Sequence, residues 1–244
     1  MSVVDSTVIT MQSPTIVTPW TSPLGVFDLE TTGIDVTTSR IVSANVGVLD
    51  PDGQVTVRHD WLADPGVEIP AAATAVHGIT TERARTEGRA AREVVAEILD
   101  VLRSLFAAGT PVVIYNAPYD LSLLAHEARR YGLAAIEHPE PIIDPLVIDK
   151  AVDRYRRGKR TLEAAAAFYG VDLTDAHDAA SDAIAAGRVA QAIARVHVDA
   201  LRMDASELHR LQVEWCRMQS ESFQDYMRRT RDPHFVASGL WPLR

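Results

Sequence analysis

LGVFDLETTG, the sequence of residues 24–33, organises the rest of the chain. An apolar run leads into Asp28 and Glu30, and two threonines followed by Gly33 end the pattern. Side chains alternate between the two faces of a strand, so a strand here would point both acids the same way. Two carboxylates at such a short distance repel each other unless a positive charge lies between them. Oxygen-rich sites of this kind hold Mg²⁺ or Mn²⁺. The alternative is an edge strand with two solvated acids that ends in a polar turn.

The composition is that of an ordinary soluble globular protein. The 244 residues are 47% hydrophobic and 23% charged, enough for one domain with an appendage. Cys216 is the single cysteine, which excludes an internal disulfide and a cysteine-rich zinc site. We see no signal-peptide pattern and no stretch near the ~20 apolar residues of a membrane span, so we expect a cytoplasmic protein with no membrane partner.

The formal net charge of −9 argues against a protein that coats nucleic acid nonspecifically. It does not exclude an enzyme that acts on nucleic acid. A carboxylate cluster that holds divalent cations is acidic in sequence and becomes locally positive once the ions are bound.

Hydrophobic periodicity predicts strands first and then alternating helices and strands. The expected strands are residues 24–30, 41–49, 55–61, 111–115 and 142–143, the first three forming an antiparallel meander. The expected helices are residues 90–107, 120–131, 161–169 and 178–196. This order predicts an α/β or α+β mixed sheet with helices on its faces. Residues 1–20 lack clear periodicity and are expected to form a flexible tail.

Two further stretches place acids at the ends of predicted elements. Asp120 stands where a buried strand gives way to a helix, an edge at which ligands of open α/β sheets collect. Taken singly, it is better explained by the helix dipole. His177 and Asp182 are five residues apart, so they can meet only if His177 lies on the loop before the helix, as the cap-like Asp178 indicates.

Taken singly, His177 is a loop histidine and Asp182 a solvated helix acid. Together with Asp28, Glu30 and Asp120, however, they supply four carboxylates and a histidine at strand ends and helix starts. That set matches the requirements of two-metal hydrolysis, in which paired cations hold the reacting oxygens and a base takes a proton from water.

The motifs FDLETTG, VHGIT, NAPYD and HDAASDA, in this order and with comparable gaps, resemble those of the DEDDh group of 3′–5′ exonucleases, the DnaQ-like family. The resemblance covers residues 24–196. It implies the ribonuclease-H-like fold, an α/β arrangement of a mixed five-stranded sheet with an antiparallel second strand, flanked by helices. The implied exonuclease domain is residues 21–200, followed by a C-terminal helical extension, residues 201–244.

The same resemblance implies two divalent cations, Mg²⁺ or Mn²⁺, as cofactors. The implied metal ligands are Asp28, which would bridge both ions, Glu30, Asp120, acting largely through bound water, and Asp182. His177 would be the general base, since an unperturbed imidazole pKa of about 6.5 is close to the operating pH. The implied neighbours of the terminal nucleotide are Thr31, Ile34 and His77, with Asn116 supporting the site.

A basic stretch precedes the helix expected at residues 161–169. Its members are Arg154, Arg156, Arg157, Lys159 and Arg160, interrupted by Tyr155. Two interpretations explain this stretch equally well. In one, it contacts phosphates and Tyr155 stacks on a base; in the other, it is a solvated basic loop. The candidate phosphate contacts are Arg157, Lys159 and Arg160.

The spacing of apolar residues predicts one long amphipathic helix over residues 207–229. Its apolar positions follow helical spacing at Leu208, Leu211, Trp215, Met218, Ser222, Phe223, Tyr226 and Met227. This stripe must be buried somewhere, and we expect it to pack back on the catalytic domain. A homodimer or a contact with a DNA polymerase is the alternative.

We therefore expect a metal-dependent exonuclease that releases nucleoside 5′-monophosphates from the 3′ end of single-stranded or frayed DNA or RNA, with DNA favoured. Within the family, the alternatives are a proofreading subunit of a polymerase and an RNA-processing exoribonuclease. The sequence has no clear clamp-binding peptide, which favours a free-standing nuclease. A noncatalytic nucleic-acid-binding module would be expected to lack a ligand, and a phosphatase of the haloacid dehalogenase kind requires DxD where this chain has Glu30.

Overall fold

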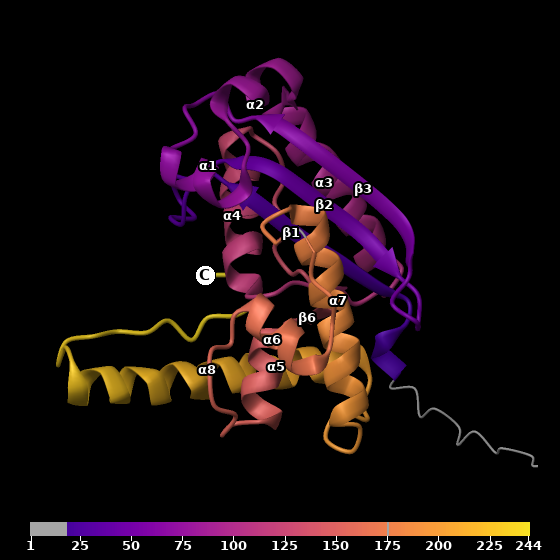
Figure 1. Cartoon of the computed structure of the whole chain (residues 1–244), viewed down its shortest axis with the longest axis vertical. Coiled ribbons are helices and arrows are strands. Elements are labelled where there is room, and N and C mark those ends of the chain that lie inside the picture. Colours follow the sequence, from indigo (N-terminus) through magenta and orange to yellow (C-terminus); the bar gives the residue numbers. More distant parts are fainter. Residues whose placement is uncertain (1–18, 175) are drawn as a thin grey trace, which may run out of the picture.

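The computed structural model describes residues 19–174 and 176–244, and a mixed sheet lies at its centre (Figure 1). The strands are β1 (Leu24–Thr31), β2 (Ile41–Leu49), β3 (Val55–Asp64), β4 (Arg89–Ala90), β5 (Val112–Val113) and β6 (Ile142–Ile143). They lie in the order β4-β3-β2-β1-β5-β6. The β1–β2 and β2–β3 pairs are antiparallel and the others are parallel. The expected five-stranded sheet is confirmed as β3-β2-β1-β5-β6, and the two-residue β4 extends one edge.

Helices cover both faces of this sheet. They are α1 (Ala71–His77), α2 (Thr81–Glu87), α3 (Ala91–Ala107), α4 (Ala117–Arg130), α5 (Pro145–Val152), α6 (Leu162–Tyr169), α7 (Ala179–Val196) and α8 (Ala205–Thr230), with a 3-10 turn, η1 (Pro19–Thr21), before β1. In Figure 1, α7 lies in front of the sheet and α3 and α4 lie behind it. Within the described residues, no helix combines the length and the apolar character needed to cross a membrane.

The central strand β1 divides its side chains between two cores. Phe27 and Leu29 pack in the cluster that includes residues of α3 and α4. Val26 packs in a second cluster, with residues of α7. Because strand side chains alternate, Asp28 and Glu30 fall on the same face as Val26, the face that α7 covers.

Gly187 lets α7 pack closely on that face. A Cβ atom at this position would lie 2.5 Å from Val26 Cγ1 and 2.6 Å from Leu49 Cδ1, well inside van der Waals contact. Glycine therefore sets how near the helix axis comes to β1 and β2. The close approach brings Asp182, in the first turn of α7, toward the acids of β1.

Trp20, near the start of the described part of the chain, is anchored in the domain. Residues 1–18 of the predicted flexible tail lie outside the described part of the chain. Trp20, at the end of the predicted tail, is buried and donates its Nε1–H to the Leu201 carbonyl at 3.1 Å. Trp20 and Leu201 belong to the same core cluster, so the predicted domain boundary at residue 200 also divides a shared core.

Helix α8 packs back on the domain, as expected, and it also completes the edge of the sheet. The backbone N–H of Ile142 in β6 donates to His209 Nδ1 at 3.1 Å, and the Ile142 carbonyl accepts from Gln212 Nε2 at 2.9 Å. Gln212 Oε1 accepts the N–H of Asp144 at 2.6 Å. Side chains of α8 thus form hydrogen bonds with main-chain groups that an open edge strand would leave without a partner.

The second half of the predicted apolar stripe is not buried. Leu208 is fully buried, whereas Met218, Phe223 and Tyr226 are about half exposed. This end of α8 extends past α5 and α6 (Figure 1). The segment of residues 231–244 turns back along the helix, and Phe235 contacts Phe223 edge-on with ring centroids 5.4 Å apart.

Candidate active site

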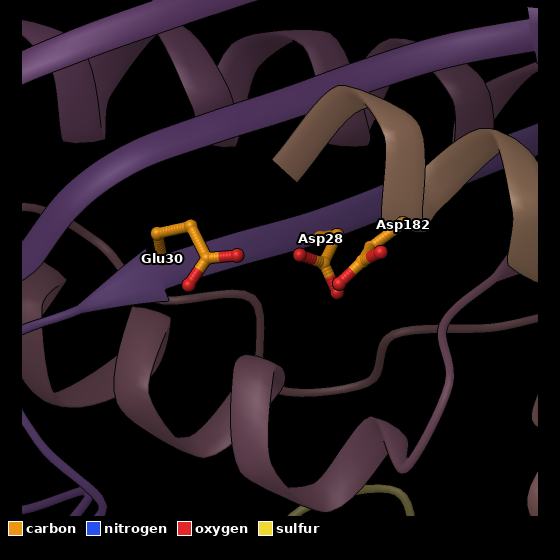
Figure 2. A group of neighbouring side chains, drawn as sticks. All are labelled: Asp28, Glu30 and Asp182. Carbon is orange, nitrogen blue, oxygen red and sulfur yellow. The ribbon is translucent and has the colours of Figure 1, made fainter. Parts of the chain in front are cut away.

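Three carboxylates from β1 and α7 come together at one point (Figure 2). Asp28, Glu30 and Asp182 each offer one oxygen atom, and these oxygens lie within 4.8 Å of one another. The first two project from the same face of β1, and Asp182 approaches from the N-terminal turn of α7. The structure therefore brings together acids that are about 150 residues apart in the sequence.

The carboxyl groups of this cluster have raised pKa values. Burial, followed by repulsion from Asp120 and Glu30, raises the pKa of Asp28 well above its usual range. Burial and the charges of Asp182 and Asp120 raise the pKa of Glu30 to about 8. Burial also raises the pKa of Asp182, while the backbone N–H of His177 partly lowers it. A divalent cation would relieve this repulsion, and carboxylate oxygens suit a hard ion such as Mg²⁺ or Mn²⁺.

Asp120 lies beside the cluster, with its side chain directed at the backbone of β1. It is 3% exposed, and its Oδ1 accepts the N–H of Leu29 at 3.2 Å. Leu29 is the residue between Asp28 and Glu30, so this hydrogen bond fixes Asp120 close to both acids. Burial raises the pKa of Asp120 to about 8. Its assignment as a ligand that acts through water stays a prediction.

His177 lies on the loop before α7, as the cap at Asp178 predicted. Its backbone has a left-handed φ of 70°, and its N–H donates to Asp182 Oδ2 at 3.2 Å. Asp178 caps the helix by accepting the N–H of Ser181. The half-exposed imidazole turns toward α6, where Nε2 lies 3.5 Å from Glu163 Oε1. The main chain of His177 is thus tied to the cluster, and the role of its side chain as base stays a prediction.

A cleft of about 420 Å³ opens beside the cluster. Both His77, the last residue of α1, and His177 line it, together with Trp61, Arg58 and Arg83. His77 Nδ1 accepts the N–H of Ile79 at 3.1 Å, which leaves the proton of a neutral imidazole on Nε2. Burial lowers the pKa of His77 and so favours this neutral form.

The loop after β1 is held to α4 and carries an exposed apolar side chain. The hydroxyl of Thr31 lies 2.5 Å from that of Tyr119 and donates to the Gly33 carbonyl at 2.8 Å. Ile34 is 92% exposed. The loop is therefore anchored to α4 while it presents an apolar side chain to solvent.

Sequence reasoning missed Asp144, the buried acid that supports the start of α4. Asn116, the N-cap of α4, has a left-handed φ of 65°, and both its N–H and that of Ala117 donate to the Asp144 carboxylate at 3.0 Å. Asp144 also caps α5 by accepting the N–H of Leu146. The sequence signal that could have identified Asp144 as buried is its position between two isoleucines and a proline.

The basic stretch divides into buried and exposed members. Arg156 Nη2 and Arg160 Nη1 each lie 2.6 Å from Oδ2 of Asp149, which is fully buried. The prediction that Arg160 contacts phosphate is therefore corrected, because its guanidinium is held inside the protein by Asp149 and by the backbone carbonyls of Asp153 and Arg156. Arg157 and Lys159 are exposed and keep their predicted role as proposals.

Comparison with known sequences identifies a family. The family model described as Exonuclease (RNase_T) matches residues 26–190. A DNA polymerase III subunit epsilon-like protein of Rhodobacter capsulatus is 31% identical over 164 residues, which are 66% of this chain and 22% of that protein. A DNA polymerase III PolC-type of Streptococcus agalactiae serotype III is 30% identical over 167 residues, 67% of this chain and 10% of that protein. The matched region thus spans less than a quarter of these curated relatives.

Solved structures share the fold. Exonuclease I of E. coli in complex with a dT13 oligonucleotide superposes with a TM-score of 0.61 at 19% identity, over 74% of this chain and 42% of that one. A moderately thermophilic exonuclease I from Methylocaldum szegediense gives a TM-score of 0.59 at 20% identity, over 73% of this chain and 41% of that one. At these identities the likeness establishes the fold.

Proposed function

The chain belongs to the exonuclease family, in the DnaQ-like branch of the ribonuclease-H-like proteins, and on this premise we propose that it removes nucleoside 5′-monophosphates from the 3′ ends of single-stranded or frayed DNA. The observation that carries the proposal is the convergence of Asp28, Glu30 and Asp182. Two relatives named as DNA polymerase III proteins support DNA over RNA as the substrate.

The three converging carboxylates, with Asp120 beside them, would hold two Mg²⁺ or Mn²⁺ ions. When bound, such ions neutralise charge on the scissile phosphate and lower the pKa of a coordinated water. The raised pKa values of Asp28 and Glu30 support this assignment, because acids gathered at this density are stable as carboxylates only beside positive charge.

His177 would take the proton of the attacking water. An imidazole suits this role because it can accept and release a proton near neutral pH. Its main chain is held by Asp182, while Nε2 lies 3.5 Å from Glu163 Oε1. In the proposed role the half-exposed ring would turn from Glu163 toward the carboxylates.

The loop after β1 and the cleft would receive the 3′-terminal nucleotide. Ile34 offers an exposed apolar side chain for a base, and His77 lines the cleft beside the cluster. The backbone at Thr31 borders the same region, and Asn116 begins the helix that carries Asp120. Arg157 and Lys159 would contact phosphates further along the strand.

Hydrolysis of a 5′-labelled single strand tests the proposal. We expect stepwise release of mononucleotides with Mg²⁺ or Mn²⁺, no release with EDTA, and faster release from DNA than from a matched RNA. Asp28→Asn should abolish the reaction. Asp199→Asn is the matched control, because Asp199 is a 97% exposed acid outside the site. Degradation that survives EDTA or Asp28→Asn would contradict the proposal, and phosphate release from small esters would favour a phosphatase.

A further inference from the structure

We propose that Trp241 is a positioning residue for Asp120, and that it acts through the buried carboxylate of Asp144. The inference rests on the proposed exonuclease function, since Asp120 is the acid whose placement it concerns. It assigns a catalytic purpose to the segment of residues 231–244, which lies outside the region matched by the family.

Asp144 is the link between that segment and α4. It is 1% exposed, and its two oxygens accept four N–H groups. Two belong to the turn that begins α4, Asn116 and Ala117, and a third is that of Leu146 in α5, all at 3.0 Å. The fourth is the indole Nε1–H of Trp241, at 3.3 Å.

The turn that Asp144 holds determines where Asp120 points. Asn116 adopts a left-handed conformation, which is uncommon for residues other than glycine although asparagine adopts it more readily than most. Asp120 follows four residues later, in the first turn of α4. A shift of this turn would therefore move the Asp120 carboxylate relative to β1.

Trp241 fixes the rotation of the Asp144 carboxylate. Its Nε1–H binds Oδ2, the same oxygen that accepts the Ala117 N–H. The ring itself is buried and packs against His209 of α8, with ring centroids 4.9 Å apart. The indole is thus a rigid donor held in place by the core.

The same segment also contacts α4 on the other side of Asp120. The backbone N–H of Arg244 donates to Ser122 Oγ at 2.9 Å, and Ser122 is buried. Residues 241–244 therefore hold α4 both before and after Asp120, through Asp144 and through Ser122.

Trp241→Phe tests the inference, because it removes the indole N–H and keeps an aromatic ring in the core. Trp20→Phe is the matched control, since Trp20 is also buried and its indole N–H binds the Leu201 carbonyl in the other core cluster. Both variants are assayed at a temperature well below their melting points. The readouts are kcat and KM on a single-stranded oligonucleotide, and amide hydrogen exchange at Asn116 and Ala117.

For Trp241→Phe we expect kcat to fall about tenfold with KM changed by less than about twofold, because the substrate contacts remain and only the placement of Asp120 is lost. The amides of Asn116 and Ala117 should exchange about tenfold faster. Trp20→Phe should change neither readout. An unchanged kcat, or unchanged exchange at these two amides, would overturn the inference.

Ser122→Ala is the second test if Trp241→Phe fails to fold. It removes only the hydroxyl that accepts the Arg244 N–H, and we expect kcat to fall about threefold. An unchanged kcat in this variant would also overturn the inference. An inactive wild-type protein would instead refute the proposed function, so the two failures are distinguishable.

Discussion

Replacing Glu30 with glutamine should stabilise the metal-free protein at alkaline pH while removing the proposed activity. Glutamine keeps the shape of the side chain but removes a charge that Asp182 and Asp120 repel. Burial and these neighbours raise the pKa of Glu30 from its usual 4.5 to about 8 in the folded protein. The folded state therefore tolerates the ionised Glu30 less well than the unfolded chain does.

The sign of the pH dependence follows from proton linkage. Below pH 4.5 both states hold the proton of Glu30, so the group does not affect stability. Between pH 4.5 and 8 the unfolded state loses the proton before the folded state does, and the free energy of unfolding falls. Above pH 8 the loss is complete, and a shift of this size corresponds to about 5 kcal/mol.

The expected gain from the substitution is smaller than this shift. Neighbouring acids share the repulsion, and a partly buried amide has its own desolvation cost, so we expect Glu30→Gln to raise the free energy of unfolding by about 2 to 4 kcal/mol at pH 8.5. For a chain of this size, that gain corresponds to a rise in Tm of about 5 to 15 °C. Near pH 4 the wild type and Glu30→Gln should be equally stable.

Thermal and urea unfolding in EDTA at pH 4 and pH 8.5 measure the effect. Glu137→Gln is the control, because Glu137 is an exposed glutamate outside the site, and it should change stability by less than about 0.5 kcal/mol. Adding Mg²⁺ at pH 8.5 should stabilise the wild type more than Glu30→Gln. A variant that is no more stable than the wild type at pH 8.5, or equally stabilised at both pH values, would refute the reasoning.

Three further predictions concern the packing of the site and its approach. Gly187→Ala places a Cβ 2.5 Å from Val26 Cγ1, so urea unfolding should show a loss of about 2 kcal/mol, together with a lower kcat; an unchanged midpoint would contradict the close packing of α7. Asp149→Ala leaves two guanidinium groups without their buried partner and should cost about 3 to 5 kcal/mol in the same assay, whereas a near-neutral result would make this network dispensable. Replacing Arg157 and Lys159 together with glutamine should weaken single-strand binding and reduce the slope of log affinity against log salt by about 1.4, and an identical slope would remove both from the binding surface.

The arrangement of the sheet and the placement of the acids on β1 follow from local patterns. Alternation along residues 24–31 determines that Asp28 and Glu30 share a face, because the period of a strand is two. The cap at Asp178 determines that His177 precedes the helix and that Asp182 lies in its first turn. These features depend on neighbours in the sequence, so periodicity and capping rules recover them.

The partners of buried charges depend on contacts between distant residues, and no local pattern encodes them. Arg160 resembles its exposed neighbours in the sequence, yet it binds the buried Asp149 eleven residues earlier. Asp144 and Trp241 are 97 residues apart, and only the return of the chain after α8 brings them together. The exposed half of α8 was missed for the same reason, since helical spacing predicts an apolar stripe without showing where the domain surface ends.

Anomalous diffraction from crystals grown with Mn²⁺ and a nucleoside monophosphate would test most directly whether the three converging carboxylates form a metal centre. We predict Mn²⁺ density bound by oxygens of Asp28, Glu30 and Asp182, with the phosphate of the nucleotide beside it and the density lost in Asp28→Asn. Nucleotide bound elsewhere, or Mn²⁺ density that is absent from these three side chains at a saturating concentration, would contradict the account.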